Sequence, residues 1–199
     1  FLPEAKVGAF LKQVHDCHGD RVTVLLDEAY NEYLDPELRF DSSRWVGQFS
    51  NLIVTRTFSK AYGLAGLRVG FAMAQPRLTD LLNRVRQPFN VNSLAQAAAT
   101  AALEDTAFLK QAYDINKAGK KTLCEAFDKL SLKYVPSYGN FVLVHVGDAA
   151  RINLELLKRG VIVRPVAGDG LPEWLRVSIG LPKENARFIE ALTQILAER

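Results

Sequence analysis

Three short apolar runs in the first part of the chain restrict its fold more than any other feature. They are VTVLL at residues 22–26, NLIVTR at 51–56 and RVGFAMA at 68–74. Each run is rich in β-forming residues, and the first changes abruptly into the polar segment DEAYNEY. Loops and helical segments separate the runs. This alternation predicts an α/β fold with a mainly parallel sheet, in which residues 22–26 are a fully buried strand.

Helical patterns surround these runs, and the pattern changes after about residue 118. Helices are predicted in residues 1–14, 76–86, 92–103, 106–129, 149–159 and 183–197. Shorter strands are predicted at 132–135, 141–146, 161–165 and 174–179. We therefore predict two domains, a larger one in residues 1–117 and a smaller α+β domain in residues 118–199.

The composition argues against several functional classes. Of 199 residues, 48% are hydrophobic and 24% charged, and the net charge is only +3. Because the basic residues are scattered, nucleic-acid binding is disfavoured, and no apolar run has the length of a membrane span. Cys17 and Cys124 are far apart in sequence and are interpreted as free thiols. This use of cysteine predicts a reducing compartment, the cytoplasm.

Polar groups with catalytic potential follow the predicted strands. Asp27 and Tyr30 come after the first strand, Ser59 and Lys60 after the second, and Arg164 after a later one. In open parallel sheets, ligands bind beyond the carboxyl ends of the strands. Asp27 directly follows apolar residues, so we expect its carboxylate to be poorly hydrated unless a cation lies close to it. An acid in this position also occurs as a helix cap or metal ligand, and position alone does not separate these roles.

Lys60 and Arg68 share a glycine-punctuated loop. A lysine near a second cation in a desolvated pocket can lose its proton and attack a carbonyl, and the arginine fork suits a phosphate. Ser59 adds a hydroxyl donor, and the glycines allow close approach of the backbone to a ligand. With Asp27, the set contains the acid, the amine and the phosphate clamp that pyridoxal phosphate requires. The separation of Asp27 from Lys60 fits one strand–crossover–strand unit, so both are predicted on neighbouring strands.

Four segments in order, DEAYNEY, TRTFSKAYGLAGLRVGF, PSYGNFVLV and LRVSIG, resemble fold-type I pyridoxal-phosphate-dependent aminotransferases. The resemblance is closest to the histidinol-phosphate aminotransferase branch and extends over essentially the whole chain. The pattern S-K-x-x-x-L-x-G-x-R-x-G is highly specific, and the other segments are supportive. The resemblance implies amino transfer between histidinol phosphate and 2-oxoglutarate in histidine biosynthesis. It also implies pyridoxal 5'-phosphate as cofactor and a homodimer.

The resemblance assigns roles at the cofactor. Lys60 would form the Schiff base and move the proton, Asp27 would pair with the pyridinium nitrogen, and Tyr30 would hydrogen-bond the phenolic oxygen. The residues implied at the phosphate are Thr57, Ser59 and Arg68.

The resemblance also assigns residues to the substrate. Arg176 matches the arginine that receives the anionic end of the substrate, with Asn140 lining the site and Arg164 as a weaker candidate. The alternation in WLRVSIG predicts that Arg176 faces away from Leu175 and Val177.

One departure concerns the extent of the family's chain. The resemblance implies that nearly as much chain again would precede residue 1. That part would bring a glycine-containing phosphate loop, a ring-stacking aromatic residue, an N-P-x-N-P-T-G asparagine and a tyrosine for the partner subunit. None of these is in this sequence. The chain is therefore expected to be the C-terminal portion, with residues 1–117 in the cofactor-binding large domain, and the resemblance does not extend to activity of this portion alone.

Some features of the sequence also fit other functions. Threonine-phosphate decarboxylases and other amino-acid aminotransferases share the lysine and arginine patterns and stay open. A non-catalytic nucleotide-binding module is disfavoured, because GLAGLRVG matches neither phosphate-loop pattern. No metal is expected at HDCH, residues 15–18, because successive helical residues point about 100° apart and only His15 and His18 could pair. His145, inside an apolar strand, is predicted to be a core histidine.

Overall fold

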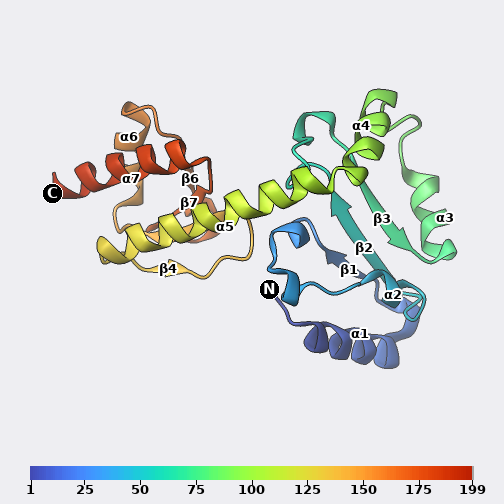
Figure 1. The fold of residues 1–199 in the computed structure, drawn as a ribbon. Helices are drawn as coiled ribbons and strands as arrows, with labels where there is room; N and C mark the ends of the chain where they lie inside the picture. Colours follow the sequence, from blue (N-terminus) through green and yellow to red (C-terminus); the bar gives the residue numbers. More distant parts are fainter. Residues whose placement is uncertain (199) are drawn as a thin grey trace. The chain divides into compact units, whose positions relative to one another are not determined.

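A mixed three-stranded sheet organises the first part of the computed structural model, which describes residues 1–198 (Figure 1). The order is β1-β2-β3, with strands Val24–Asp27, Leu52–Thr57 and Gly70–Ala74. β1 and β2 are parallel, as predicted, whereas β2 and β3 are antiparallel. Between β2 and β3 the chain forms only a short 3₁₀ turn, Ala65–Leu67, so it reverses direction instead of crossing over. The α/β class is observed, but the sheet is mixed rather than mainly parallel.

One face of this sheet carries a hydrophobic core. Leu52 and Val54 of the central strand are fully buried, and they pack with residues of α1 (Glu4–His18) and α2 (Ser43–Val46). On β1, Val24 and Leu26 pack against this core, while Leu25 is 60% exposed. The prediction that residues 22–26 are fully buried is therefore wrong. β1 is an edge strand of the described sheet, and its alternate side chains point away from this core.

Three helices follow the sheet, with bounds close to the predicted ranges. They are α3 (Pro76–Val85), α4 (Ser93–Glu104) and α5 (Thr106–Lys129). The Asn92 side chain caps α4 by accepting a hydrogen bond from the backbone N–H of Ala95 at 2.8 Å. Ala95 and Ala99 of α4 pack against Phe58 and Val69 in a small second core. The loop that carries Lys60 is therefore anchored by α4 through Phe58.

The chain divides into two compact units between Lys110 and Gln111, within α5. The second unit contains an antiparallel sheet of order β4-β5-β7-β6. Its strands are Tyr134–Val135, Phe141–His145, Trp174–Ser178 and Arg164–Pro165, and its further helices are α6 (Ala149–Lys158) and α7 (Pro182–Ala197). The predicted boundary at residue 117 lies in the same helix α5.

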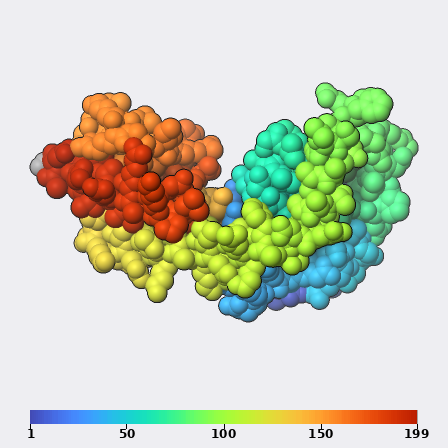
Figure 2. All heavy atoms as spheres, turned by 45° about the horizontal axis from the view of Figure 1, so that its top comes forward, coloured from blue at the N-terminus to red at the C-terminus, as the bar shows by residue number. Residues whose placement is uncertain are grey.

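Helices cover one face of the second sheet. Val142, Val144, Leu175 and Val177 share that face and are buried against α5, α6 and α7. Phe141, Leu143 and Arg176 alternate with them and belong to the opposite face. α6 and α7 lie side by side, as the orange and red spheres show (Figure 2).

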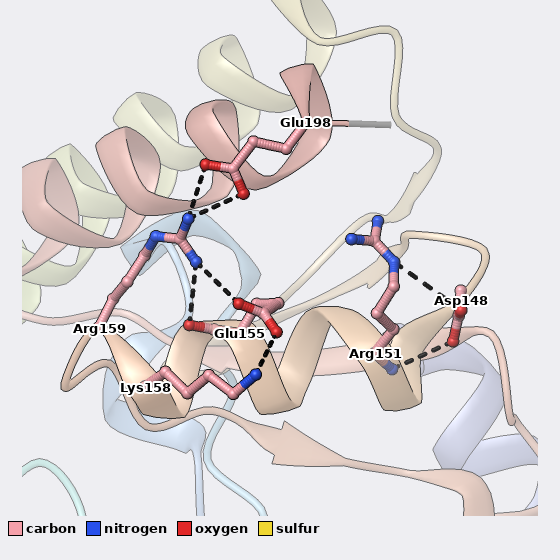
Figure 3. A network of polar contacts seen from close by, with 6 residues as sticks. All are labelled: Asp148, Arg151, Glu155, Lys158, Arg159 and Glu198. Carbon is pink, nitrogen blue, oxygen red and sulfur yellow. Dashed lines mark hydrogen bonds and ion pairs between the residues drawn. The ribbon is translucent and has the colours of Figure 1, made fainter.

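A charged network joins the ends of α6 and α7 (Figure 3). Arg159 donates to the carboxylate of Glu155 at 3.2 Å and to both carboxylate oxygens of Glu198 at 2.8 and 2.9 Å. Lys158 also donates to Glu155 at 2.7 Å, and this hydrogen bond is the main reason why the pKa of Glu155 lies below its ordinary value. Because Arg159 follows α6 and Glu198 follows α7, this network fixes the two helix ends to each other.

Candidate active site

Asp27 ends β1 at the carboxyl edge of the first sheet. Its Oδ1 atom accepts a hydrogen bond from the Ala29 backbone N–H at 3.1 Å and lies 3.5 Å from the hydroxyl oxygen of Thr55. Thr55 is also its partner across the β1–β2 ladder. The expectation of a poorly hydrated carboxylate is wrong, because Asp27 is exposed. It lies on the same sheet face as Leu25, and its exposed carboxylate is accessible to a ligand.

Lys60 and Tyr30 come together from the segments that follow β2 and β1. The Lys60 Nζ atom lies 5.5 Å from the centre of the Tyr30 ring, a cation–π distance. Lys60 itself is exposed, and its carbonyl accepts the backbone N–H of Gly63 at 2.9 Å, which closes a tight turn. Parallel pairing of β1 and β2 therefore places Asp27, Tyr30 and Lys60 at one end of one sheet.

The predicted phosphate residues lie where the two ends of the Lys60 loop meet, at Phe58 and Val69. This closure is called the neck of the loop. The backbone N–H of Phe58 donates to the carbonyl of Val69 at 3.2 Å, which brings the adjacent residues Ser59 and Arg68 to the same end of the loop. The Thr57 hydroxyl accepts from the backbone N–H of Ser59 at 3.1 Å. The neck therefore brings the residues Thr57, Ser59 and Arg68 to one end of the loop.

Arg68 adopts an unusual backbone conformation. Its φ of 53° and ψ of 51° lie in the left-handed region, which costs an L-residue roughly 1–2 kcal/mol. The side chain is exposed, and its Nη1 atom donates to the Ala65 carbonyl at 2.9 Å. Strained residues of this kind cluster at ligand-binding positions, so the conformation marks Arg68 as a candidate ligand contact.

A second charged group next to these residues was not predicted from the sequence. The Arg56 Nε atom donates to Glu28 Oε2 at 2.9 Å, and the side chains are only 26% and 8% exposed. Burial raises the pKa of Glu32 above its ordinary value, although Arg56 and Arg39 act in the opposite direction. Burial, with the charge of Glu32, also raises the pKa of Tyr62. One sequence signal could have revealed this ion pair. Leu52, Val54 and Arg56 are alternate residues of one strand and share its covered face, so a charged Arg56 there requires an acidic partner.

The raised pKa of Glu32 makes a prediction for stability. The folded state binds the Glu32 proton more tightly than the unfolded chain does. Its stabilising contribution is therefore present below the unfolded pKa, near 4.5, and is lost as pH rises through the raised folded pKa. Glu32→Gln, which cannot ionise, should melt at a higher temperature than wild type at pH 7–8, and this gain should vanish at about pH 4.

The measurement is the melting temperature across pH 4–8, on protein expressed from its complete reading frame. Glu37→Gln removes the same charge from an exposed position and serves as the control. A lower melting temperature for Glu32→Gln at pH 8 would show that the pairing of Glu32 with the arginines outweighs its burial.

The predicted substrate residues lie in the second unit. Arg176 on β7 pairs with Leu143 of β5 on one side and with Arg164 of β6 on the other. The Arg176 guanidinium lies 4.9 Å from the centre of the Phe141 ring, and its buried Nε atom has no hydrogen-bond partner within residues 1–198. As predicted, Arg176 faces away from the buried Leu175 and Val177. Two arginines opposite each other repel, so this pair favours an anion as ligand.

Asn140 lies directly before β5, opposite Ile179, which follows β7. Its backbone carbonyl accepts the N–H of Ile179 at 2.8 Å, which continues the β5–β7 ladder beyond Ser178. Asn140 is half-buried.

A groove of about 940 Å³ lies elsewhere in the first unit. Residues of β3, the 83–91 segment and α4 line it, among them Phe71, Arg86 and Phe89. None of the predicted site residues lines it. No acidic, histidine, lysine or cysteine side chain lines it, so the chemistry favours the carboxyl end of the sheet as the active site.

Within residues 1–198, no cluster of three or more histidine, cysteine or acidic side chains is placed to hold a metal ion. None of the described helices has both the length and the apolar character needed to cross a bilayer. The Nε2 atom of His145 lies 3.4 Å from Oε2 of Glu173, and the ring packs edge-on against Trp174. His145 is partly exposed at the end of β5, so the prediction of a core histidine is wrong.

Known proteins resemble this chain in sequence and in fold. The chain is 62% identical over its whole length to "Histidinol-phosphate aminotransferase 2" of Ralstonia nicotianae, of which it covers 53%. It is 61% identical over 98% of its length to "Histidinol-phosphate aminotransferase 1" of Cupriavidus pinatubonensis, of which it covers 52%. The chain thus spans about half the length of the curated relatives it matches.

The fold gives the same result. All of the chain superposes on 54% of the histidinol-phosphate aminotransferase from Sinorhizobium meliloti, solved in complex with pyridoxal-5'-phosphate, with a TM-score of 0.85 and 28% identity. The profile of the family described as "Aminotransferase class I and II" matches residues 9–192, which include both sheets and every predicted site residue. The chain therefore belongs to the aminotransferase class I and II family.

Proposed function

We propose that the protein transfers an amino group between histidinol phosphate and 2-oxoglutarate, with pyridoxal 5'-phosphate as cofactor. The observation that carries the proposal is the placement of Lys60 beside the Tyr30 ring, at the end of the first sheet where Asp27 ends β1. It occurs in a chain that is 62% identical to a histidinol-phosphate aminotransferase along its whole length.

The residues of the first unit fit the cofactor chemically. Lys60 would hold it covalently, and the accessible carboxylate of Asp27 would meet its ring nitrogen. Its phosphate would be bound by Thr57, Ser59 and Arg68, which the closed neck of the loop gathers. The bound cofactor would supply an electron sink for the carbon that carries the substrate's amino group.

The remaining chemistry belongs to side chains of this chain. Asp27 would keep the ring nitrogen protonated, and Tyr30 would donate a hydrogen bond to the phenolic oxygen. Lys60 would then carry the proton between two carbon atoms as a general base and general acid. Its exposed amine and the short turn that holds it are compatible with that movement.

The substrates are anions, which suits the second unit. A guanidinium fork accommodates both the phosphate of histidinol phosphate and the carboxylate of glutamate. We assign this role to Arg176, with Arg164 opposite it across the ladder and Asn140 at the end of the neighbouring strand.

We also propose the wider setting. Residues 1–117 would form part of the cofactor-binding large domain and residues 118–199 the small α+β domain. The enzyme would act in the cytoplasm as a homodimer on small molecules, without nucleic-acid or membrane partners.

The test is an assay of protein expressed from its complete reading frame. Histidinol phosphate and 2-oxoglutarate should yield glutamate, and borohydride should fix the cofactor on Lys60, as peptide mass spectrometry can show. Decarboxylation of threonine phosphate without transamination would replace the proposed reaction by that of a related decarboxylase. Failure of borohydride to fix any cofactor would overturn the class of chemistry itself.

Asp27→Asn makes a further prediction. The substitution keeps the side-chain shape but removes the charge that would hold the ring nitrogen protonated. A charge-assisted hydrogen bond contributes about 1.5–3 kcal/mol, so kcat should fall about tenfold to a hundredfold. Asp80→Asn is the control, because Asp80 is an exposed partner of Arg84 on α3. Wild-type turnover in Asp27→Asn would move the partner of the ring nitrogen to another residue.

A further inference from the structure

An ion pair links the two segments that carry the candidate catalytic groups of the first unit. Asp27 and Tyr30 lie in residues 27–33, and Lys60 lies in residues 57–63. Arg56, directly before the second segment, bonds Glu28 of the first at 2.9 Å. The Glu28 backbone N–H also donates to the Thr55 carbonyl at 2.9 Å, so the β1–β2 ladder continues to this residue.

The ion pair lies on the face opposite the candidate site. Leu52 and Val54 alternate with Arg56 along β2 and point into the core formed with α1 and α2. Thr55 points to the other face, where its hydroxyl lies near the Asp27 carboxylate. Arg56 therefore fixes the strand ends from the covered side and leaves the Asp27 side open to a ligand.

The environment of Arg56 makes it a central member of this group. The Glu28 side chain is only 8% exposed, and a carboxylate so buried requires a cation. Arg56 also lies close enough to Glu32 and Tyr62 to act electrostatically on both, one from each segment. The carbonyl of Arg56 meets Gly70 of β3, where a Cβ atom would stand only 2.7 Å away. Glu28, Glu32, Tyr62 and β3 therefore all converge on this arginine.

We propose that Arg56 is a positioning residue for the reaction, and this inference rests on the proposed function. Through Glu28 it holds residues 27–33 against residues 57–63, so that Asp27 and Lys60 keep the spacing that the cofactor requires. Arg56 does not touch the reacting atoms. Its removal acts through the relative position of the two segments.

The principal variant is Arg56→Gln in protein expressed from its complete reading frame. Misplacement of catalytic groups by a fraction of an ångström to 1 Å costs about tenfold to a hundredfold, so kcat should fall by that factor. The dissociation constant of pyridoxal 5'-phosphate, measured by fluorescence titration of the apo-protein, should rise about tenfold for the same reason. The pH dependence of the bound cofactor's absorbance should shift as well. Arg56→Lys retains the charge and should recover part of each loss.

The matched control is Arg159→Gln. Arg159 is also paired with glutamates and is 27% exposed, against 26% for Arg56, but it lies in the second unit at the ends of α6 and α7. This variant should lower the melting temperature and leave kcat, cofactor affinity and absorbance unchanged. If Arg56→Gln does not fold, Glu28→Gln keeps the shape and an acceptor oxygen, and the same readouts apply to it.

Two results would overturn the inference. One is a lower melting temperature for the Arg56 or Glu28 variant with unchanged cofactor affinity and kcat. That result would show that Arg56 has a purely structural role. The other is an equal loss of activity in Arg159→Gln. Borohydride labelling of the wild-type protein separates these results from a failure of the proposed function. If no cofactor is fixed there, the proposed function fails and this inference fails with it.

Discussion

Lys60→Ala is expected to abolish transamination while leaving the fold intact. The side chain would supply both the covalent attachment of the cofactor and the proton carrier, and general acid–base catalysis alone contributes about 10²–10⁴-fold. A loss of turnover of at least about 10³-fold is therefore expected. Stability should change little, because Lys60 is exposed and contacts the ring of Tyr30 only at a cation–π distance.

Steady-state turnover, melting temperature and borohydride labelling of protein expressed from its complete reading frame test this prediction. Lys12→Ala is the control, because Lys12 is an exposed lysine of the same unit that pairs with Asp16 on α1. Cofactor should still bind Lys60→Ala without a covalent bond, through Arg68 and Asp27. Turnover above a trace, or borohydride labelling of another lysine, would remove Lys60 from its assigned role.

The local sequence pattern predicted the elements well but not the direction of every strand. Helix periodicity and caps such as Asn92 are local signals, so α3, α4 and α5 begin and end close to the expected residues. The parallel pairing of β1 with β2 follows from the long connection between them. An apolar run carries no direction, however, and residues 68–74 run antiparallel because the preceding loop contains only a short turn.

The candidate site shows the same limit. The motif around Lys60 specifies residue types and spacing, and the structure places Lys60 beside Tyr30 and Ser59 next to the loop neck. Exposure of Asp27 was not predictable, because burial depends on what covers the sheet face and not on the neighbouring residues in sequence. The ion pair of Glu28 with Arg56 was missed for a related reason, since cross-strand partners depend on register.

Arg176→Ala is expected to impair both half-reactions and not only one. Arg176 lies opposite Arg164, and its buried Nε atom has no hydrogen-bond partner within residues 1–198. In the bound state Arg176 would pair with the anionic group of the substrate. Removing one member of such a desolvated pair of opposite charges costs about 2–5 kcal/mol, so kcat/KM should fall roughly thirtyfold to several thousandfold for each anionic substrate. Stability should fall much less than activity, because the substitution also relieves repulsion between the two arginines.

Single-turnover kinetics with histidinol phosphate and with glutamate, measured separately, decide the role of Arg176. Arg176→Lys keeps the charge but loses the fork, so it should retain part of each rate, with losses of about 1–3 kcal/mol. Arg151→Ala is the control, because the pair of Arg151 with Asp148 is solvent-exposed and should change neither rate by more than about 1 kcal/mol. A defect confined to glutamate would leave Arg176 as a carboxylate binder and transfer the phosphate to Arg164. Unchanged rates with both substrates would leave the stacking of Arg176 on Phe141 as its role, because that contact does not depend on a bound anion.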